Sequence, residues 1–171
     1  MLAILLTPGI GRGQSASPSA NQLKAAFVYH FAQFVEWPTG TFKDSHSPII
    51  VGILGENPFG GELEKTLSGK RVNERLLEVQ QFGSVSEATN ACQILFINPP
   101  DHKQLPDIVK SLGNARILTI GDSEGFTEAD GMIGFFMEGA KVRFRINDAA
   151  AKRVGLRISS KLLSLASRSG R

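Results

Sequence analysis

Three short, continuous apolar runs constrain the fold of this 171-residue chain more than any other feature. They are IIVGIL at residues 49–54, ILFI at 94–97 and ILTI at 117–120. Apolar runs of this length without polar alternation are typical of strands that are buried on both faces, as in parallel sheets. Helix signals separate them, so we expect a βαβαβ order with helices on both faces of a parallel sheet.

The segments between these runs contain the expected helices. A helix is predicted over 57–67, where a proline falls in the first turn, and another over 106–112, which a glycine follows. Residues 84–91 begin with capping residues and favour a short helix, whereas residues 76–82 alternate moderately and favour a weaker strand.

The last third of the chain changes to an antiparallel pattern. MIGFFM at 132–137 and KVRFRIN at 141–147 are joined by a short turn containing Gly139, which predicts a hairpin. The second arm alternates strictly, with one face apolar and the other cationic through Lys141, Arg143 and Arg145. Such an arm has one face on the core and one in solvent, and its cations suit an edge strand.

Helices over 147–154 and 158–165 are expected to complete the fold. The sequence therefore predicts an α/β fold over residues 21–171, organised as one domain. We expect a three-layer sandwich with a mostly parallel central sheet, a C-terminal antiparallel hairpin and flanking helices.

An aromatic-rich amphipathic helix is predicted near the start of the chain, in LKAAFVYHFAQFVEWP at 23–38. Asn21 is its expected N-cap, and Pro38 ends it. One stripe of this helix consists of Leu23, Phe27, Phe31 and Phe34. The stripe is either core or a docking surface. Core packing is favoured because a parallel sheet needs helices on each face. The residues off the stripe, Tyr29, His30 and Trp37, are then the candidates for a dimer or partner contact.

Residues 1–20 differ in kind from the rest. Their apolar start, the following small residues and the absence of acids resemble a secretory signal peptide that lacks its charged first region, so export to the periplasm is expected. A disordered N-terminal tail is the alternative. No run of about 20 apolar residues follows, so no membrane-spanning helix is predicted in the mature chain.

Charge is divided unevenly along the mature sequence. Residues 21–140 carry nine bases and 15 acids, whereas residues 141–171 carry nine bases and one acid. This basic part is suited to an acidic partner, to anionic lipid headgroups, or to the acidic part of its own chain. Nucleic acid fits less well, because aromatic residues other than Phe144 do not interleave with the bases.

No pattern in the sequence predicts catalysis, a metal or a cofactor. GENPFGG at 55–61 lacks the lysine and hydroxyl of a phosphate loop and favours a tight turn between strand and helix. Asp122, Glu124 and Asp130 lack the spacing of a calcium loop. The three histidines are isolated, and Cys92 is expected to be a small buried apolar residue.

Several of these stretches together resemble the YfiR-like family of small exported proteins. They are LKAAFVYHFAQFVEWP, IIVGILGENPFGGEL, CQILFI, ILTIGDSEGF, GMIGFF with VRFRIN, and AAAKRVGLRISSKLLSLA, in that order from residue 23 to residue 166. The resemblance implies a periplasmic α/β domain, often dimeric, that acts by binding. It also implies a partner, the periplasmic domain of an inner-membrane signalling protein such as a diguanylate cyclase or a sensor kinase, whose output it represses. Only Cys92 stands at a family cysteine position and the chain has no second cysteine to pair with it, so control through an intramolecular disulfide is not expected.

The sequence is therefore consistent with two functions, a protein-binding regulator and a small-ligand-binding module. In the first, a non-enzymatic regulator contacts its partner through the cationic strand face, with exposed aromatic anchors beside it. The residues of this site are Lys141, Arg143, Arg145, Phe126, Phe135 and Trp37. In the second, a small ligand binds at the loops after the central strands, through Asn57, Phe59 and Asp122.

Overall fold

The computed structural model describes residues 17–167 of the chain, and the predicted leader lies mostly outside this range. A seven-stranded sheet forms its centre, in the order β3-β4-β2-β5-β6-β7-β8. The strands are β2 (Ile49–Gly55), β3 (Arg71–Val72), β4 (Arg75–Phe82), β5 (Ile94–Asn98), β6 (Leu118–Gly121), β7 (Ile133–Glu138) and β8 (Lys141–Ile146).

The sheet is parallel through its middle and antiparallel at both edges. β4, β2, β5, β6 and β7 run parallel, whereas β3 pairs antiparallel with β4 and β8 antiparallel with β7. The three apolar runs of the sequence are the adjacent central strands β2, β5 and β6, as predicted. The expected hairpin is β7–β8. The parallel strands follow a doubly wound order. After β2 the chain adds β4 on one side and then β5, β6 and β7 on the other, so the strand order reverses between β2 and β5.

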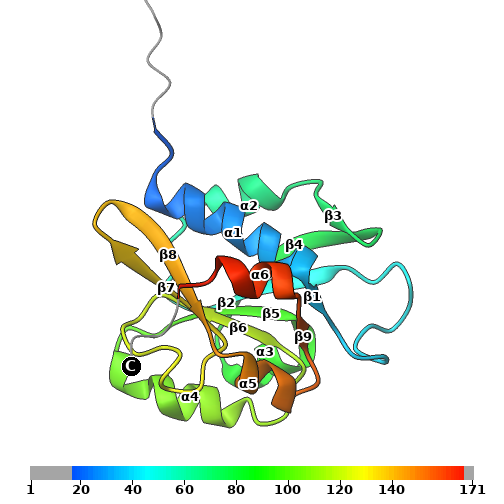
Figure 1. Ribbon diagram of the computed structural model, residues 1–171. Helices are drawn as coiled ribbons and strands as arrows, with labels where there is room; N and C mark the ends of the chain where they lie inside the picture. Colours follow the sequence, from blue (N-terminus) through cyan, green and yellow to red (C-terminus); the bar gives the residue numbers. More distant parts are fainter. Residues whose placement is uncertain (1–16, 168–171) are drawn as a thin grey trace, which may run out of the picture.

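Helices cover both faces of the sheet, which confirms the three-layer α/β prediction (Figure 1). On one side lie α1 (Ala20–Phe34), α2 (Glu62–Leu67) and α6 (Ser160–Leu165); on the other lie α3 (Val85–Ala91) and α4 (Leu105–Ser111), the latter preceded by a 3-10 turn, His102–Gln104. α5 (Asp148–Arg153) follows β8. A two-stranded antiparallel ladder, β1 (Val35–Glu36) with β9 (Arg157–Ile158), ties the end of α1 to the start of α6.

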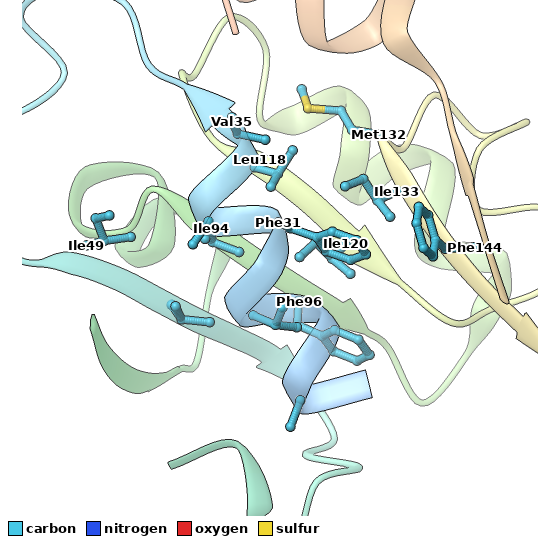
Figure 2. Close-up of a cluster of buried hydrophobic side chains, with 14 of the residues drawn as sticks. Phe31, Val35, Ile49, Ile94, Phe96, Leu118, Ile120, Met132, Ile133 and Phe144 are labelled. Atoms are coloured by element: carbon cyan, nitrogen blue, oxygen red, sulfur yellow. The ribbon is translucent and has the colours of Figure 1, made fainter. Parts of the chain in front are cut away.

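The larger core lies between α1 and the sheet. Figure 2 shows α1 crossing this face, with Phe31 and Val35 beside the strand side chains of Ile94, Leu118 and Ile120. Phe31 is fully buried, and its ring lies 5.0 Å from that of Phe144. Burying a large aromatic side chain stabilises a fold by about 1.5–3 kcal/mol. The aromatic stripe is therefore part of the core, although its other three members are only partly buried.

Two local expectations differ from the structure for identifiable reasons. The N-cap of α1 is Ser19, not Asn21, because Ser19 and Gln22 form a reciprocal capping box. The helix expected over 57–67 begins only at Glu62. Ahead of it, Gly60 and Gly61 have φ values of 55° and 89°, which a helix does not accommodate.

Candidate functional site

The hairpin places the predicted cations on one open face of the sheet. Lys141 and Arg143 are exposed, whereas Val142 and Phe144 between them are only 8% and 3% exposed and belong to the core. Arg145 is half-buried. The alternation predicted from the sequence is therefore correct, and one side of β8 is a cationic surface.

Phe136 of β7 extends this surface with an aromatic ring. The Arg145 guanidinium lies over the ring, 4.1 Å from its centroid, and Arg143 is the cross-strand partner of Phe136. Nε of Arg143 also donates to a carboxylate oxygen of Glu138 at 3.0 Å. We call Phe136, Lys141, Arg143 and Arg145 the hairpin face. Arg145 is held in place by the aromatic ring and Arg143 by the carboxylate, whereas Lys141 is exposed.

This part of the sheet is bordered by a loop instead of a helix. Residues 122–131 leave β6 and run beside the hairpin face, and between them lies a hollow of about 340 Å³. Its lining includes Asp122, Glu124 and Glu128 from the loop and Phe136 and Arg145 from the hairpin. The hollow is therefore acidic on one wall and cationic and aromatic on the other.

Within residues 141–167, most of the cations outside the hairpin face pair with acids of the same chain. Lys152 lies 2.6 Å from Asp148, and Arg157 lies 3.7 Å from Glu36. Arg153 pairs with Asp130. Among the cations of residues 141–167, Lys141, Arg145 and Lys161 have no carboxylate within 4.0 Å, and Lys161 lies over the Phe34 ring. Two of these three cations, Lys141 and Arg145, lie on the hairpin face.

Phe126 and Phe135 are not exposed anchors, and that expectation was wrong. Phe126 is 2% exposed, and its ring fills a slot above two glycines, Gly121 and Gly131, where an added Cβ would lie 2.3 and 2.2 Å from the ring. Phe135 is 3% exposed, and its ring lies 5.6 Å from that of Phe31. Both rings pack in the hydrophobic core. The partly accessible aromatic residue of this surface is Phe136.

Trp37 lies apart from the hairpin face. It is half-buried, its indole Nε1 donates to the carbonyl of Gln93 at 3.4 Å, and its ring meets that of Phe42 edge-on at 6.0 Å. Gln93 precedes β5, so Trp37 lies at the end of the sheet where the parallel strands begin. The hairpin turn follows β7 and lies at the opposite end, where the parallel strands finish. A role for Trp37 in partner binding stays a prediction, and the structure does not bring this residue together with the hairpin face.

The three residues of the alternative ligand site have structural partners. Phe59 is 2% exposed, with its ring 4.8 Å from that of Phe96. The Asn57 side chain accepts from the Phe59 amide at 2.9 Å, which closes a local turn. Asp122 pairs with Lys24 of α1. Asp122 therefore lies beside α1, and Phe59 is not accessible to a ligand.

The crevice expected where the strand order reverses is partly closed. The Glu56 amide donates to the Asn98 carbonyl at 2.9 Å, and the Asn98 side chain donates back to the Glu56 carbonyl at 3.0 Å. Within residues 17–167, no group of three or more His, Cys, Asp or Glu side chains is arranged to hold a metal ion. No helix over the same residues has the length and apolar character needed to cross a bilayer.

Sequence reasoning missed Phe136 as a surface residue. The signal was present, because the hairpin register places Phe136 opposite Arg143, so the two share a face. Choosing Phe135 as the exposed ring assigned β7 the opposite orientation. The partners Glu138 and Lys24 were also missed, since neither belongs to a recognisable motif.

The fold defines this protein as a small α/β domain built on one mostly parallel sheet. Residues 21–167 match the model of the YfiR/HmsC-like family, and the chain belongs to that family. No curated protein matches the sequence. Among solved structures, it is similar to the "conserved domain protein" of Vibrio cholerae O1 biovar El Tor strain N16961, with a TM-score of 0.54 and 10% identity. The similarity covers 87% of this chain and 60% of that one, and at this identity it shows a shared fold alone.

Proposed function

We propose that this protein is an exported, non-enzymatic regulator that binds the periplasmic part of a membrane signalling protein and represses its output. The partner is a diguanylate cyclase, whose product cyclic-di-GMP promotes biofilm formation, or a sensor kinase. Membership of the YfiR/HmsC-like family supports this class of function. A dimer of this chain would be compatible with such binding.

The observation that carries the proposal is the hairpin face. Lys141 and Arg145 have no carboxylate partner among the described residues, and the Arg145 guanidinium lies over the half-buried ring of Phe136. Complementary charge accelerates the encounter with an acidic partner, while a desolvated ring and guanidinium contribute most of the affinity. An open face of this composition fits recognition of a protein better than recognition of a small molecule.

The test is a charge reversal of the hairpin face. Lys141, Arg143 and Arg145 are changed together to Glu, and the protein is co-expressed with a membrane-anchored diguanylate cyclase or sensor kinase of its own organism. We expect loss of co-purification and release of the partner's output. A matched variant changes the exposed Lys43, Lys103 and Lys110 to Glu, and it should bind and repress normally.

Circular dichroism of both triple variants separates lost binding from lost folding. A folded hairpin variant that still co-purifies and represses would rule out the hairpin face as the contact. Loss of binding in both variants would point to net charge rather than to this surface.

Small-ligand binding is the second candidate, and the hollow beside the hairpin supports it. Its volume of about 340 Å³ is within the range of ligand sites, and Asp122 lies on its wall. Thermal-shift screening against envelope metabolites tests this function. A ligand that stabilises the wild type but not an Arg145→Ala variant would favour it, and a screen without hits would count against it.

A further inference from the structure

We propose that the outer edge of β8 is a strand-addition site for an extended, acidic segment of a partner protein. The inference rests on the proposed function only in placing the contact on the same hairpin. It goes further by assigning main-chain hydrogen bonds to the contact and by specifying the sequence pattern of the segment that binds.

The hairpin register determines which backbone groups of β8 face outward. The Asn147 amide donates to the Met132 carbonyl of the neighbouring strand region at 2.8 Å, so the backbone of residue 147 faces β7. Backbone groups alternate along an antiparallel strand, so those of Arg145, Arg143 and Lys141 face β7 as well. The amides and carbonyls of residues 142, 144 and 146 therefore point away from the sheet.

One outward group of this edge already receives a backbone hydrogen bond from another segment. The Ser167 amide, just after α6, donates to the outward carbonyl of Phe144 at 2.9 Å. Among the described residues, no hydrogen bond reaches the outward groups of Val142. Among residues 17–167, nothing pairs with the half of the edge nearest the hairpin turn, and the middle receives a single hydrogen bond from the segment after α6.

The side chains of β8 determine which segment fits. On an added strand, residues directly opposite Lys141, Arg143 and Arg145 would have their Cβ atoms about 4.5–5.5 Å away, on the cationic face. Acidic residues pair favourably there. The alternate residues of that strand would lie beside Val142 and Phe144, whose side chains belong to the core, so apolar residues are favoured. The expected segment alternates acidic and apolar residues.

The same cations disfavour pairing between two copies of this chain. If two β8 edges met, Lys141, Arg143 and Arg145 of one copy would lie on the same face as those of the other. Like charges opposite one another destabilise a strand pair. The edge is therefore suited to an acidic strand of a different protein rather than to a second copy.

Two labelled peptides of identical composition test the pattern, with binding to the full chain followed by fluorescence anisotropy. In one, glutamates alternate with valine and threonine; in the other, the glutamates are grouped at one end. We expect the alternating peptide to bind about tenfold more tightly, because only its charges meet the cations in register. Equal affinity for the two peptides, or no binding of either, would overturn strand addition.

A backbone variant separates main-chain pairing from charge attraction. Val142→Pro removes an outward amide without removing a β7–β8 hydrogen bond, and it should weaken alternating-peptide binding about tenfold or more. Val142→Thr keeps the amide and should bind like the wild type. If Val142→Pro fails to fold, peptides N-methylated at every second amide replace it, and one of the two methylation registers should abolish binding to the wild type.

The outcomes also distinguish this inference from the proposed function. If Val142→Pro binds the alternating peptide normally, or if the wild type binds both methylated peptides normally, strand addition is wrong. Should the charge-reversed hairpin variant then still fail to co-purify with the signalling partner, the hairpin face is the contact through its side chains alone. Dimerisation of the wild type that Val142→Pro abolishes would instead assign the edge to a second copy, against the inference.

Discussion

Lys24 and Asp122 lie 98 positions apart in the chain and form an ion pair of 2.7 Å between Nζ and Oδ2. Their side chains are only 13% and 20% exposed. Lys24 belongs to the first turns of α1, and Asp122 follows β6. Together with a 2.6 Å hydrogen bond from the Asn21 side chain to the Pro58 carbonyl, the pair fixes the start of α1 beside two strand ends.

Removing either partner of this pair should destabilise the fold. Lys24→Met and Asp122→Asn each leave the other polar group poorly solvated, at an expected cost of roughly 1–3 kcal/mol in the free energy of unfolding. Urea unfolding measures the change. Lys65→Met is the matched control, because its amine lies 3.9 Å from Glu62 and is 77% exposed, and surface pairs contribute at most about 1 kcal/mol. A loss no larger than the control's would mean that the pair is incidental.

The sequence was sufficient to predict the sheet, because burial on both faces leaves a strong local signal. IIVGIL, ILFI and ILTI contain no polar residue apart from one threonine, and they became the three adjacent central strands β2, β5 and β6. Strict alternation in KVRFRI likewise identified the exposed and buried faces of β8. The part of the candidate site on β8 was therefore predictable from periodicity alone.

Features that leave no periodic pattern in the sequence were not predictable. The burial of Phe126 depends on two glycines that leave room for its ring, at positions 121 and 131. The β1–β9 ladder is only two residues long on each side, too short for a period. The capping box at Ser19 was hidden because residues 1–20 were assigned to a leader, although α1 begins at Ala20.

Gly121→Ala should destabilise the protein because of the Phe126 ring. A Cβ at position 121 would lie 2.3 Å from that ring, and overpacking of this kind typically costs about 1–3 kcal/mol. Gly134→Ala is the matched control. It also changes a strand glycine beside Phe126, but its added Cβ would meet the nearest Phe126 atom at 3.4 Å, so a much smaller loss is expected.

Thermal unfolding of both variants tests the clash. If the ring is the cause, Gly121→Ala should cost less when it is combined with Phe126→Leu than it does alone. Equal costs in the two backgrounds, or a larger loss for Gly134→Ala, would contradict a glycine slot occupied by Phe126.

Cys92 should make the protein less stable at alkaline pH. The thiol is buried, its Sγ donates to the Ala88 carbonyl at 3.2 Å, and burial raises its pKa from 9.0 to about 12. Above pH 9.0 the unfolded chain ionises at this position while the folded chain stays protonated. The unfolded state is then favoured progressively up to about pH 12, at no more than about 1.4 kcal/mol per pH unit. Below pH 9 this contribution to stability does not change.

Comparing the pH dependence of unfolding in the wild type and in Cys92→Ala isolates this thiol from other groups that titrate in the same range. The wild type should lose stability more steeply above pH 9.0, whereas the two slopes should agree below it. Labelling with a thiol reagent at neutral pH gives a second measurement, because a buried, protonated Cys92 reacts only when the protein opens. Labelling at the rate of a free thiol, or equal alkaline slopes, would show that the side chain is accessible in the folded protein.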